Sequence, residues 1–515
     1  MGEPAPARYA HYALGVLVLV YVFNFVDRQI LSILNDEIKR DLHLRDAQMG
    51  FLYGTAFAVF YALFGIPLGR LADVWVRRSL VAASLAAWSA MTALSGLASS
   101  FAELASARIG VGIGEAGASP AAFALLSDYY PPARRATALS LYSSGIYIGA
   151  GLGLMIGGQI VHRWDAAFPA GSAPFALRGW QVAFFAVGLP GLLLALWVRS
   201  LREPARGAMD GAPAVPAAPP RPFAEFAREL GAVIPPFGVF RLARMGVRVG
   251  GNLAALGAIA LCSSALARAT GDTAQWSALG LGVYAAITWA QSLELRDPAA
   301  ADVILRTPAL RWTAVGVALL AFTGYGVGYW TTPFFLRVHR VPIERAGFVL
   351  GGMAAAAGWL GIALGGILGD AWRRRDRRGR LFVAMVAAAL PLPVLPVMLG
   401  TANTSLALAL NFPLAAAGSM WIGVGAATIQ DLVPPRMRGT ATAAYLLVIT
   451  FIGLAMGPYS MGRLSDVLGD VRPALGLGLV ANAVALGCLW RASQHLEAAE
   501  KALCARAPAA LETSH

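Results

Sequence analysis

The segment GRLADVWVRR occupies residues 69–78, and a similar segment, GILGDAWRRR, occupies residues 366–375. A second pair repeats in the same order, with SDYYPPARRATA at 127–138 and QDLVPPRMRGTA at 430–441. The two pairs are offset by 297 and 303 residues. Repeats in the same order at nearly equal offsets indicate two homologous halves that arose by duplication.

The composition around these repeats is strongly apolar. Hydrophobic residues make up 57% of the 515-residue chain and charged residues 13%, against about 45–50% and about 25% in soluble domains. A soluble protein of this size cannot bury so much apolar surface, so the composition predicts a membrane protein. The net charge of +13 comes mostly from arginines in short loops and one linker. This distribution favours a membrane-orientation signal over nucleic-acid binding.

Apolar stretches of about 20 residues, the length that crosses a bilayer as a helix, recur along the chain. They predict an all-α polytopic membrane protein. The candidate spans are 11–34, 48–68, 79–98, 103–127, 137–161, 179–198, 250–268, 274–293, 309–333, 343–369, 381–400, 405–430, 440–464 and 473–491.

The repeats assign these spans to two six-helix halves with twelve core transmembrane helices. The N-terminal half is predicted over 1–198 and the C-terminal half over 301–491. Residues 199–300 are predicted to form a central linker with an inserted helix pair, and residues 492–515 a cytoplasmic tail. Transporters built from such repeats bind their substrate near the membrane midplane, between the repeats.

The inserted pair consists of the candidates 250–268 and 274–293. An even insertion preserves the orientation of the second half, so both candidates cross the membrane or neither does. We favour crossing, and the alternative is a helical hairpin that lies at the membrane interface.

Arginines orient the chain by the positive-inside rule. They cluster after the second and fourth spans and at the matching places of the second half, which puts all of these loops and both termini in the cytoplasm. For a bacterial protein this predicts a multi-pass protein of the inner (plasma) membrane. The orienting residues are Arg70, Arg77, Arg78, Arg134, Arg135, the run WRRRDRRGR at 372–380, Arg436 and Arg438.

The first repeat resembles the loop pattern of the major facilitator superfamily, and the resemblance implies the major facilitator fold. The sequence departs from the pattern at Val74, where arginine is usual, and at Val76, where glycine is usual. The matching positions are Gly69, Leu71, Asp73, Arg77 and Arg78.

Three further segments resemble the spinster family within that superfamily. They are NFVDRQILSIL at 24–34, RIGVGIGEAGASPAA at 108–122 and RGWQVAFFAVGLPGLLLA at 178–195. Spinster relatives are lipid transporters associated with lysophospholipids and sphingosine-1-phosphate, and their bacterial members are associated with proton coupling. The resemblance therefore implies a lipid or lysolipid substrate, and it places the family's acid–base residues in the first two segments.

Ionisable residues inside the spans are costly, so each one is a candidate functional residue. Asp27 lies nine residues before Asp36, where the first external loop begins; this places it about 13 Å deep. Glu115 lies twelve residues after Glu103, about 18 Å from the same surface. We therefore expect the two carboxyl groups to share a depth.

Each carboxyl group has an arginine on its own helix. Arg28 follows Asp27, and Arg108 precedes Glu115 by seven residues, about two turns of one helix face. We predict that Asp27 and Glu115 carry the coupling protons and that Arg28, Arg108 and Glu115 bind substrate. Protonation of Asp27 would free an arginine for a lipid phosphate. The alternative is a structural ion-pair network that holds the two helices together.

Asp73 and Asp370 lie where a span enters an arginine-rich loop. An aspartate there can accept the backbone N–H groups at the N-terminus of the next helix. With Arg77 and Arg78, these residues are predicted to form a cytoplasmic gate. The alternative is charge that only sets the membrane topology.

Aromatic side chains cluster near the outer end of the first span of the second half. We predict that Tyr325 and Trp330 line the substrate cavity, and the alternative is an interfacial aromatic belt. The glycine pattern Gly112-x-Gly114-x-x-Gly117 matches a dinucleotide fingerprint, but it lies in an apolar helix with no preceding strand. We interpret these glycines as helix-packing positions.

The leading hypothesis is a proton-coupled secondary transporter that moves a lipid or lysolipid amphiphile by alternating access. The alternative is a major facilitator transporter of a small water-soluble organic anion or drug. An enzyme is not expected, because the H-x4-D pairing of many acyltransferases is missing. We expect no metal site and no cofactor, with protons as the coupling ion. Expected partners are membrane lipids and the amphiphilic substrate, with no nucleic acid, and the chain is expected to be a monomer.

Overall fold

The computed structural model describes residues 7–169, 172–207, 209, 221–234, 237–244, 249–434 and 437–506. All regular elements of these ranges are helical. Arg436 and the linker residues 210–220 lie outside the described ranges.

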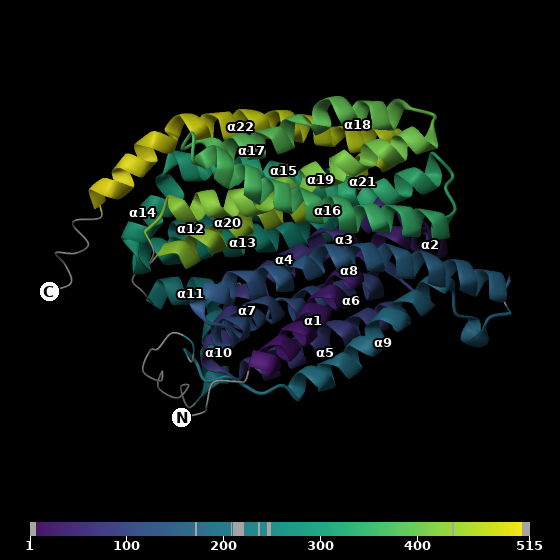
Figure 1. The fold of residues 1–515 in the computed structure, drawn as a ribbon, viewed down its shortest axis with the longest axis horizontal. Helices are drawn as coiled ribbons and strands as arrows, with labels where there is room; N and C mark the ends of the chain where they lie inside the picture. Colours follow the sequence, from purple (N-terminus) through teal and green to yellow (C-terminus); the bar gives the residue numbers. More distant parts are fainter. Residues whose placement is uncertain are drawn as a thin grey trace. The chain divides into compact units, whose positions relative to one another are not determined.

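The helices of the N-terminal part follow the predicted spans closely (Figure 1). Proline and glycine break several of them, since proline lacks a backbone N–H and glycine favours helix ends. The elements are α1 (Ala7–Ile33), α2 (Asn35–Asp41), α3 (Asp46–Tyr53), α4 (Thr55–Val74), α5 (Arg77–Ser95), α6 (Phe101–Glu115), α7 (Ala118–Tyr129), α8 (Pro132–Ala167), η1 (Pro174–Ala176) and α9 (Gly179–Arg199).

Most of the central and C-terminal helices coincide with predicted spans, but the short helices at 222–233, 237–244 and 298–306 lie outside every predicted span. The elements are α10 (Pro222–Val233), α11 (Phe237–Arg244), α12 (Gly250–Thr270), α13 (Thr273–Arg296), α14 (Pro298–Arg306), α15 (Pro308–Arg337), α16 (Ile343–Arg373), α17 (Gly379–Ala389), α18 (Pro391–Gly400), α19 (Thr404–Asp431), α20 (Arg438–Val448), the π-helical turn η3 (Ile449–Ala455), α21 (Met456–Leu468) and α22 (Val471–Arg506).

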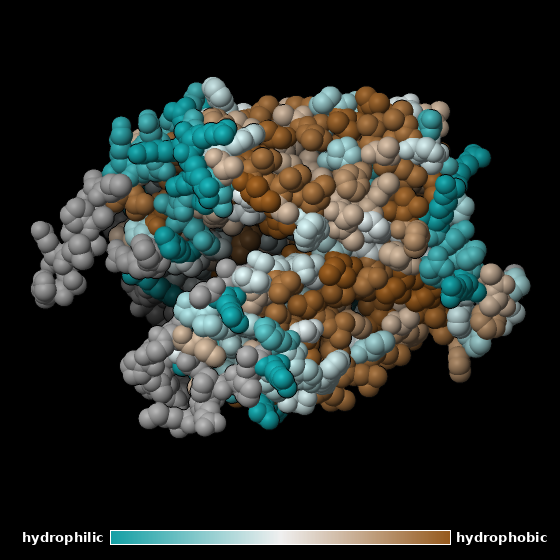
Figure 2. Space-filling model, in the orientation of Figure 1, coloured by the Kyte–Doolittle hydropathy of each residue, from teal (hydrophilic) through white to brown (hydrophobic). Residues whose placement is uncertain are grey.

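Among the described residues, 12 helical stretches are long and apolar enough to cross a membrane. They include every predicted core span except 79–98, and they add α12. The predicted span 79–98 forms α5, whose polar residues Ser84, Ser89 and Thr92 are buried inside the protein. The all-α polytopic fold is thus confirmed. On the face seen in Figure 2, hydrophobic residues cover the middle of the helices and hydrophilic residues gather at their ends.

The inserted pair is present as α12 and α13, joined at Gly271, whose φ of 76° favours glycine. Tyr284 of α13 donates its hydroxyl to Oδ1 of Asn252 on α12 at 2.6 Å. None of the residues in the most apolar 18-residue stretch of α12 is buried within the protein. The crossing of the membrane by both helices stays a prediction.

By its internal contacts the chain divides into two compact units, which differ from the domain boundaries predicted above. The first unit is Met1–Leu44, Ala56–Ala285 and Val341–Ala355. The second unit is Arg45–Thr55, Ala286–Arg340 and Ala356–His515. Residues 45–55 of the predicted N-terminal half belong to the second unit, and residues 341–355 of the predicted C-terminal half belong to the first.

In the first unit, small residues let the helices approach closely. A Cβ atom at Gly153 of α8 would lie 2.7 Å from the carbonyl oxygen of Val26 on α1. A Cβ at Gly112 of α6 would lie 2.6 Å from the carbonyl oxygen of Phe57, and one at Gly114 would lie 2.7 Å from the backbone nitrogen of Trp88. The interpretation of the glycine pattern as a packing motif is therefore confirmed.

In the second unit, α15, α17, α19 and α22 surround an apolar core of residues such as Val317, Trp421 and Leu489. The short helix α3 packs against α21. Asp466 accepts the backbone N–H groups of Asp46 and Ala47 at 2.9 and 2.8 Å, which caps the N-terminus of α3.

The side chain of Asp46 forms a second link at the same place. It pairs with Arg337 through two bonds of 2.7 and 3.0 Å, and it accepts the hydroxyl of Ser465 at 2.7 Å. Gly462 lies directly against the backbone of Asp46. The contact between α3 and α21 therefore combines the Asp466 cap, the Ser465 hydrogen bond and a close glycine contact, and the ion pair joins α3 to the end of α15.

Candidate functional site

The four predicted acid–base residues form one cluster in the first unit. Asp27 of α1 pairs with Arg108 of α6, with Oδ1 and Nη1 3.1 Å apart. Both residues are only 1% exposed. A fully buried pair of this kind persists because each charge compensates the other in a medium of low dielectric.

Arg28 and Glu115 form the second ion pair of the cluster. Nε and Nη2 of Arg28 lie 2.7 and 2.6 Å from the same oxygen, Oε2 of Glu115. The Glu115 side chain is 0% exposed, whereas the Arg28 side chain is 18% exposed. Among the described residues, the buried Oε1 of Glu115 has no hydrogen-bond partner, so this oxygen is available to hold a proton.

The pairing follows from the geometry of the two helices. Adjacent residues on a helix point about 100° apart, so Asp27 and Arg28 reach different partners on α6. Arg108 and Glu115, seven residues or about two turns apart on α6, meet them from the same face of that helix. The structure thus brings together all four residues that were predicted as the acid–base site. Their roles in proton coupling and substrate binding stay predictions.

Thr92 of α5 completes the cluster and was not predicted from the sequence. Its hydroxyl contacts Oδ2 of Asp27 and also lies 2.9 Å from the carbonyl oxygen of Trp88. Thr92 is 0% exposed. The only sequence signal was a threonine in the middle of an apolar span, and that signal is weak because threonine often bonds its own helix backbone.

The predicted aromatic residues lie in the second unit. Tyr325 of α15 is partly buried and packs against the apolar core. Trp330 is fully buried; its indole N–H donates to the carbonyl oxygen of Pro458 at 2.8 Å, and its ring lies 5.6 Å from the guanidinium of Arg337. The hydrogen bond joins Trp330 to α21, and the ring contact places Trp330 beside the Asp46–Arg337 pair. Substrate contact by either residue stays a prediction.

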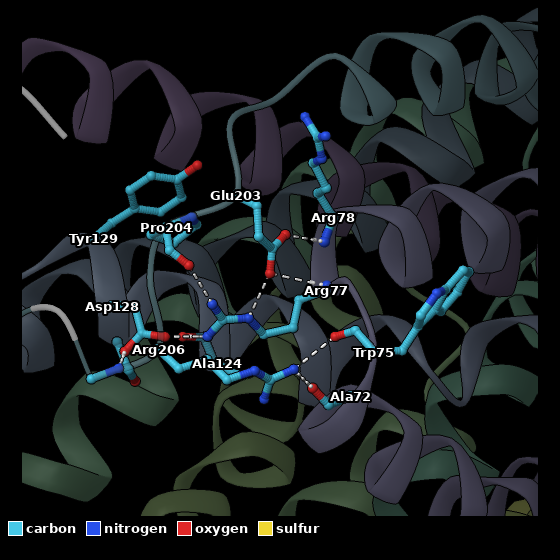
Figure 3. Close-up of polar contacts among 12 residues, drawn as sticks. Ala72, Trp75, Arg77, Arg78, Ala124, Asp128, Tyr129, Glu203, Pro204 and Arg206 are labelled. Carbon is cyan, nitrogen blue, oxygen red and sulfur yellow. Dashed lines mark hydrogen bonds and ion pairs between the residues drawn. The ribbon is translucent and has the colours of Figure 1, made fainter. Parts of the chain in front are cut away.

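A second polar cluster surrounds Arg77 at the start of α5 (Figure 3). The Arg77 guanidinium contacts the Asp128 carboxylate, and its Nε lies 2.9 Å from Oε1 of Glu203. Glu203 also accepts the backbone N–H groups of Arg77 and Arg78 at 3.1 and 3.0 Å. Glu203 therefore caps the N-terminus of α5.

The segment after α9 holds this cluster together. Arg206 donates to the carbonyl oxygens of Ala72 and Trp75 at 3.1 and 2.7 Å, and Gly207 donates its N–H to Asp128 at 3.0 Å. Burial lowers the pKa of Arg206 from its ordinary value, and the nearby charge of Arg77 adds to this effect. The start of the predicted linker, residues 203–207, thus contacts the C-terminal ends of α4 and α7 and the N-terminus of α5.

Asp73 and Asp370 are more exposed than the gate hypothesis suggests. The Asp73 side chain is 65% exposed and lies 3.6 Å from Arg70. The Asp370 side chain is also 65% exposed and pairs with Arg380 at 2.9 Å. The structure places Glu203, rather than Asp73, on the N–H groups at the start of α5. The gate role of Asp73, Arg77, Arg78 and Asp370 stays a prediction.

No group of three or more His, Cys, Asp or Glu residues within the described ranges is arranged to hold a metal ion. The chemistry available in the acid–base cluster is proton exchange and ion pairing. A side chain that could bind an anion is Arg28, the most exposed member of the cluster.

Comparison with known proteins identifies related transporters. The sequence model described as the Major Facilitator Superfamily matches residues 17–458. An MFS-type efflux pump of Mycolicibacterium smegmatis is 28% identical over 496 residues, which are 94% of this chain and 93% of the pump. The hexuronate transporter of Bacillus subtilis is 30% identical over 202 residues, which are 39% of this chain and 44% of that transporter.

A solved structure is similar over nearly the whole chain. It is a bacterial homologue of the human lysosomal transporter spinster, in an inward-facing and unoccupied conformation. The TM-score is 0.67 with 25% sequence identity, and the match covers 96% of this chain and 98% of that chain. The similarity agrees with the segments that resemble the spinster family.

Proposed function

Because the chain belongs to the Major Facilitator Superfamily, we propose that it is a proton-coupled secondary transporter. We propose that it moves a lipid or lysolipid amphiphile across the membrane by alternating access. The observation that carries the proposal is two adjacent ion pairs, the fully buried Asp27–Arg108 and the partly buried Arg28–Glu115. Buried ionisable groups within membrane-spanning segments mark proton and substrate pathways.

The charge of the cluster changes with each proton that it binds. When Asp27 and Glu115 are both ionised, the two carboxylates balance the two arginines. A proton on either carboxyl group leaves one arginine charge uncompensated in a medium of low dielectric. That charge attracts an anionic headgroup, so proton binding and substrate binding favour each other.

The two ion pairs have different parts in this scheme. A proton on Glu115 removes the charge that holds Arg28, whose side chain is 18% exposed. Arg28 is then the ligand for the anionic headgroup, because a guanidinium binds phosphate oxygens through two parallel bonds. Asp27 and Arg108 are buried more completely, and we assign Asp27 the second proton site.

The amphiphilic substrate has support from two sources. Residues 24–34, 108–122 and 178–195 resemble the spinster family. The structure is similar to that of a bacterial homologue of the human lysosomal transporter spinster. We also propose that the chain acts as a monomer in a bacterial inner membrane, with both termini in the cytoplasm and protons as the coupling ion.

A second candidate function is the transport of a small water-soluble organic anion or drug. The similarity to a hexuronate transporter favours an organic anion, and the similarity to an efflux pump favours a drug. The same cluster serves this candidate, since a hexuronate also carries a carboxylate that an arginine binds. The two candidates therefore differ in the substrate rather than in the proton chemistry.

Transport into proteoliposomes tests the proposal. Purified protein is reconstituted, and the uptake of a lysophospholipid is measured with and without an imposed pH gradient, beside the uptake of a hexuronate. We expect gradient-dependent lysophospholipid transport that falls to background in Asp27→Asn. The matched control is Asp165→Asn, which removes an exposed carboxylate from the outer part of α8.

The outcomes separate the candidates. Lysophospholipid transport that is indifferent to both the pH gradient and Asp27→Asn would overturn proton coupling. Hexuronate uptake without lysophospholipid uptake would overturn the lipid substrate in favour of a water-soluble organic anion. An equal loss in Asp165→Asn would show that the effect of Asp27→Asn is not specific to the cluster.

A further inference from the structure

Arg28 lies among three aromatic rings as well as beside Glu115. Its guanidinium carbon is 4.1 Å from the ring centroid of Phe57, 5.1 Å from that of Phe25 and 5.2 Å from that of Tyr61. A cation within about 6 Å of a ring centroid is attracted to the negative face of the ring. Three such rings around one cation form a cage, which we call the Arg28 cage.

The chain builds this cage from two helices. Phe57 and Tyr61 are four residues apart on α4, so their rings lie one above the other, with centroids 5.3 Å apart and an interplanar angle of 22°. Phe25 lies one turn before Arg28 on α1. The cage is fixed in place by packing, because Phe57 is 1% exposed.

The position of the cage beside Glu115 is also set by packing. Gly112 lies directly against the backbone of Phe57 and brings α6 into contact with α4. Glu115 follows Gly112 by three residues, close to one helical turn. The ring of Phe57 and the carboxylate of Glu115 therefore reach the guanidinium of Arg28 from neighbouring helices.

We infer that Phe57 and Tyr61 are positioning residues that hold the Arg28 guanidinium in place while Glu115 changes its charge. This inference rests on the proposed function, in which Arg28 binds the anionic headgroup. The attraction of Arg28 to Glu115 is lost when the carboxyl group takes up a proton. The attraction to the rings does not depend on that proton, because it arises from the negative faces of the rings rather than from the carboxylate charge.

Without the rings, a neutral Glu115 would hold the Arg28 guanidinium less firmly than the charged carboxylate does. The fraction of molecules with Arg28 in the binding position would fall, and the apparent KM would rise by the same factor. We expect an increase of about tenfold, which corresponds to about 1.4 kcal/mol. The maximal rate is expected to change less, since the proton sites remain intact.

The first test removes the aromatic ring faces and keeps an apolar side chain at each position. Phe57→Leu keeps an apolar side chain but removes the ring face, and Tyr61→Leu does the same at the second ring. Tyr61→Phe is the matched control, because it keeps the ring and removes only the hydroxyl. We expect a higher apparent KM for lysophospholipid in both leucine variants and an unchanged KM in Tyr61→Phe.

A graded version of this test separates electrostatics from packing. Phe57 is replaced by mono-, di- and trifluorinated phenylalanine, which weaken the negative ring face stepwise at nearly constant size. We expect the logarithm of the apparent KM to rise with each fluorine. A KM that is constant across the series would overturn the inference, because a ring that acts only by packing is insensitive to fluorination.

A second readout does not depend on transport. The thermal unfolding midpoint is compared for Phe57→Leu, Arg28→Met and the double variant, which forms a double-mutant cycle. We expect Phe57→Leu to lower the midpoint less in the Arg28→Met background than in the native protein. If the two substitutions lower the midpoint additively, the inferred interaction between Phe57 and Arg28 is contradicted. Coupled effects together with no lysophospholipid transport would retain the cage and contradict the proposed function instead.

Discussion

The hydroxyl of Thr92 contacts the buried carboxyl group of Asp27. The same hydroxyl lies 2.9 Å from the carbonyl oxygen of Trp88, so its single proton has two acceptors within reach. When Asp27 is ionised, Thr92 donates to it. When Asp27 is protonated, the acid donates to Thr92, and Thr92 turns its own proton to Trp88. Thr92 therefore has a hydrogen-bond partner in both charge states of Asp27.

Replacing Thr92 with valine tests this relationship, because valine has the same shape without the hydroxyl. A lost hydrogen bond to a buried charged group costs about 1.5–3 kcal/mol, so we expect proton-driven uptake to fall by about tenfold or more. Thr92→Ser keeps the hydroxyl and is expected to retain most of the uptake. The measurement is gradient-driven uptake in proteoliposomes, and equal activity of the valine and serine variants would contradict the role of the hydroxyl.

The Arg28–Glu115 pair permits a test that separates function from stability. Glu115→Gln leaves the charge of Arg28 without its carboxylate, which we expect to cost about 3 kcal/mol and to lower the thermal unfolding midpoint. Combining Arg28→Met with Glu115→Leu removes both charges, and we expect the midpoint to recover. Both variants are expected to lose proton-driven transport. A double variant that is stable and transports normally would show that the pair is only a structural link.

The cap on α5 predicts a contrast between two acidic residues. Glu203→Gln weakens the ion pair to Arg77 and the cap on two backbone N–H groups, so we expect a loss of about 1–2 kcal/mol. Asp73→Asn removes an exposed charge that pairs with Arg70 at the surface, and we expect a change within about 0.5 kcal/mol. Thermal unfolding of the two purified variants checks this order. The reverse order would favour the gate role predicted for Asp73.

Two glycines in the second unit predict opposite effects of alanine. At Gly462 a Cβ atom would overlap the backbone of Asp46, and we expect a loss of about 1–3 kcal/mol from overpacking. At Gly476 of α22 a Cβ atom would meet nothing within 4 Å, and we expect a gain of about 0.5–1 kcal/mol from higher helix propensity. Unfolding midpoints of Gly462→Ala and Gly476→Ala test the contrast, and a stable Gly462→Ala would show that α3 and α21 separate readily.

The sequence was sufficient for the helices because their signal is local. Length and apolarity placed most spans within about six residues, and the repeats identified the family fold, but the last helix continues to Arg506, well beyond the predicted span 473–491. α5 shows the limit of this reasoning, since Ser84, Ser89 and Thr92 make it more polar than the other spans. They are accommodated because the protein interior, rather than lipid, surrounds them.

The site was only partly predictable, because pairing depends on helix rotation and tilt. Depth along the helix predicted that Asp27 and Glu115 lie together, but it left open which arginine each carboxylate meets. The aromatic cage was also missed, since Phe57 and Tyr61 are ordinary residues of an apolar span. Glu203 was missed because it caps a helix more than 120 residues earlier in the chain, and local sequence patterns carry no information on such a distant contact.

The separation of the paired charges along the chain has a consequence for biosynthesis. Asp27 and Arg28 leave the ribosome 81 and 87 residues before their partners on α6. At about 5–20 residues per second, α1 waits roughly 4–17 s for those partners. During that interval α1 carries two adjacent, opposite charges that make its insertion into the bilayer less favourable. The arrival of α6 provides a compensating charge for each residue, so we expect α1 to become stably embedded only after α6 has been translated.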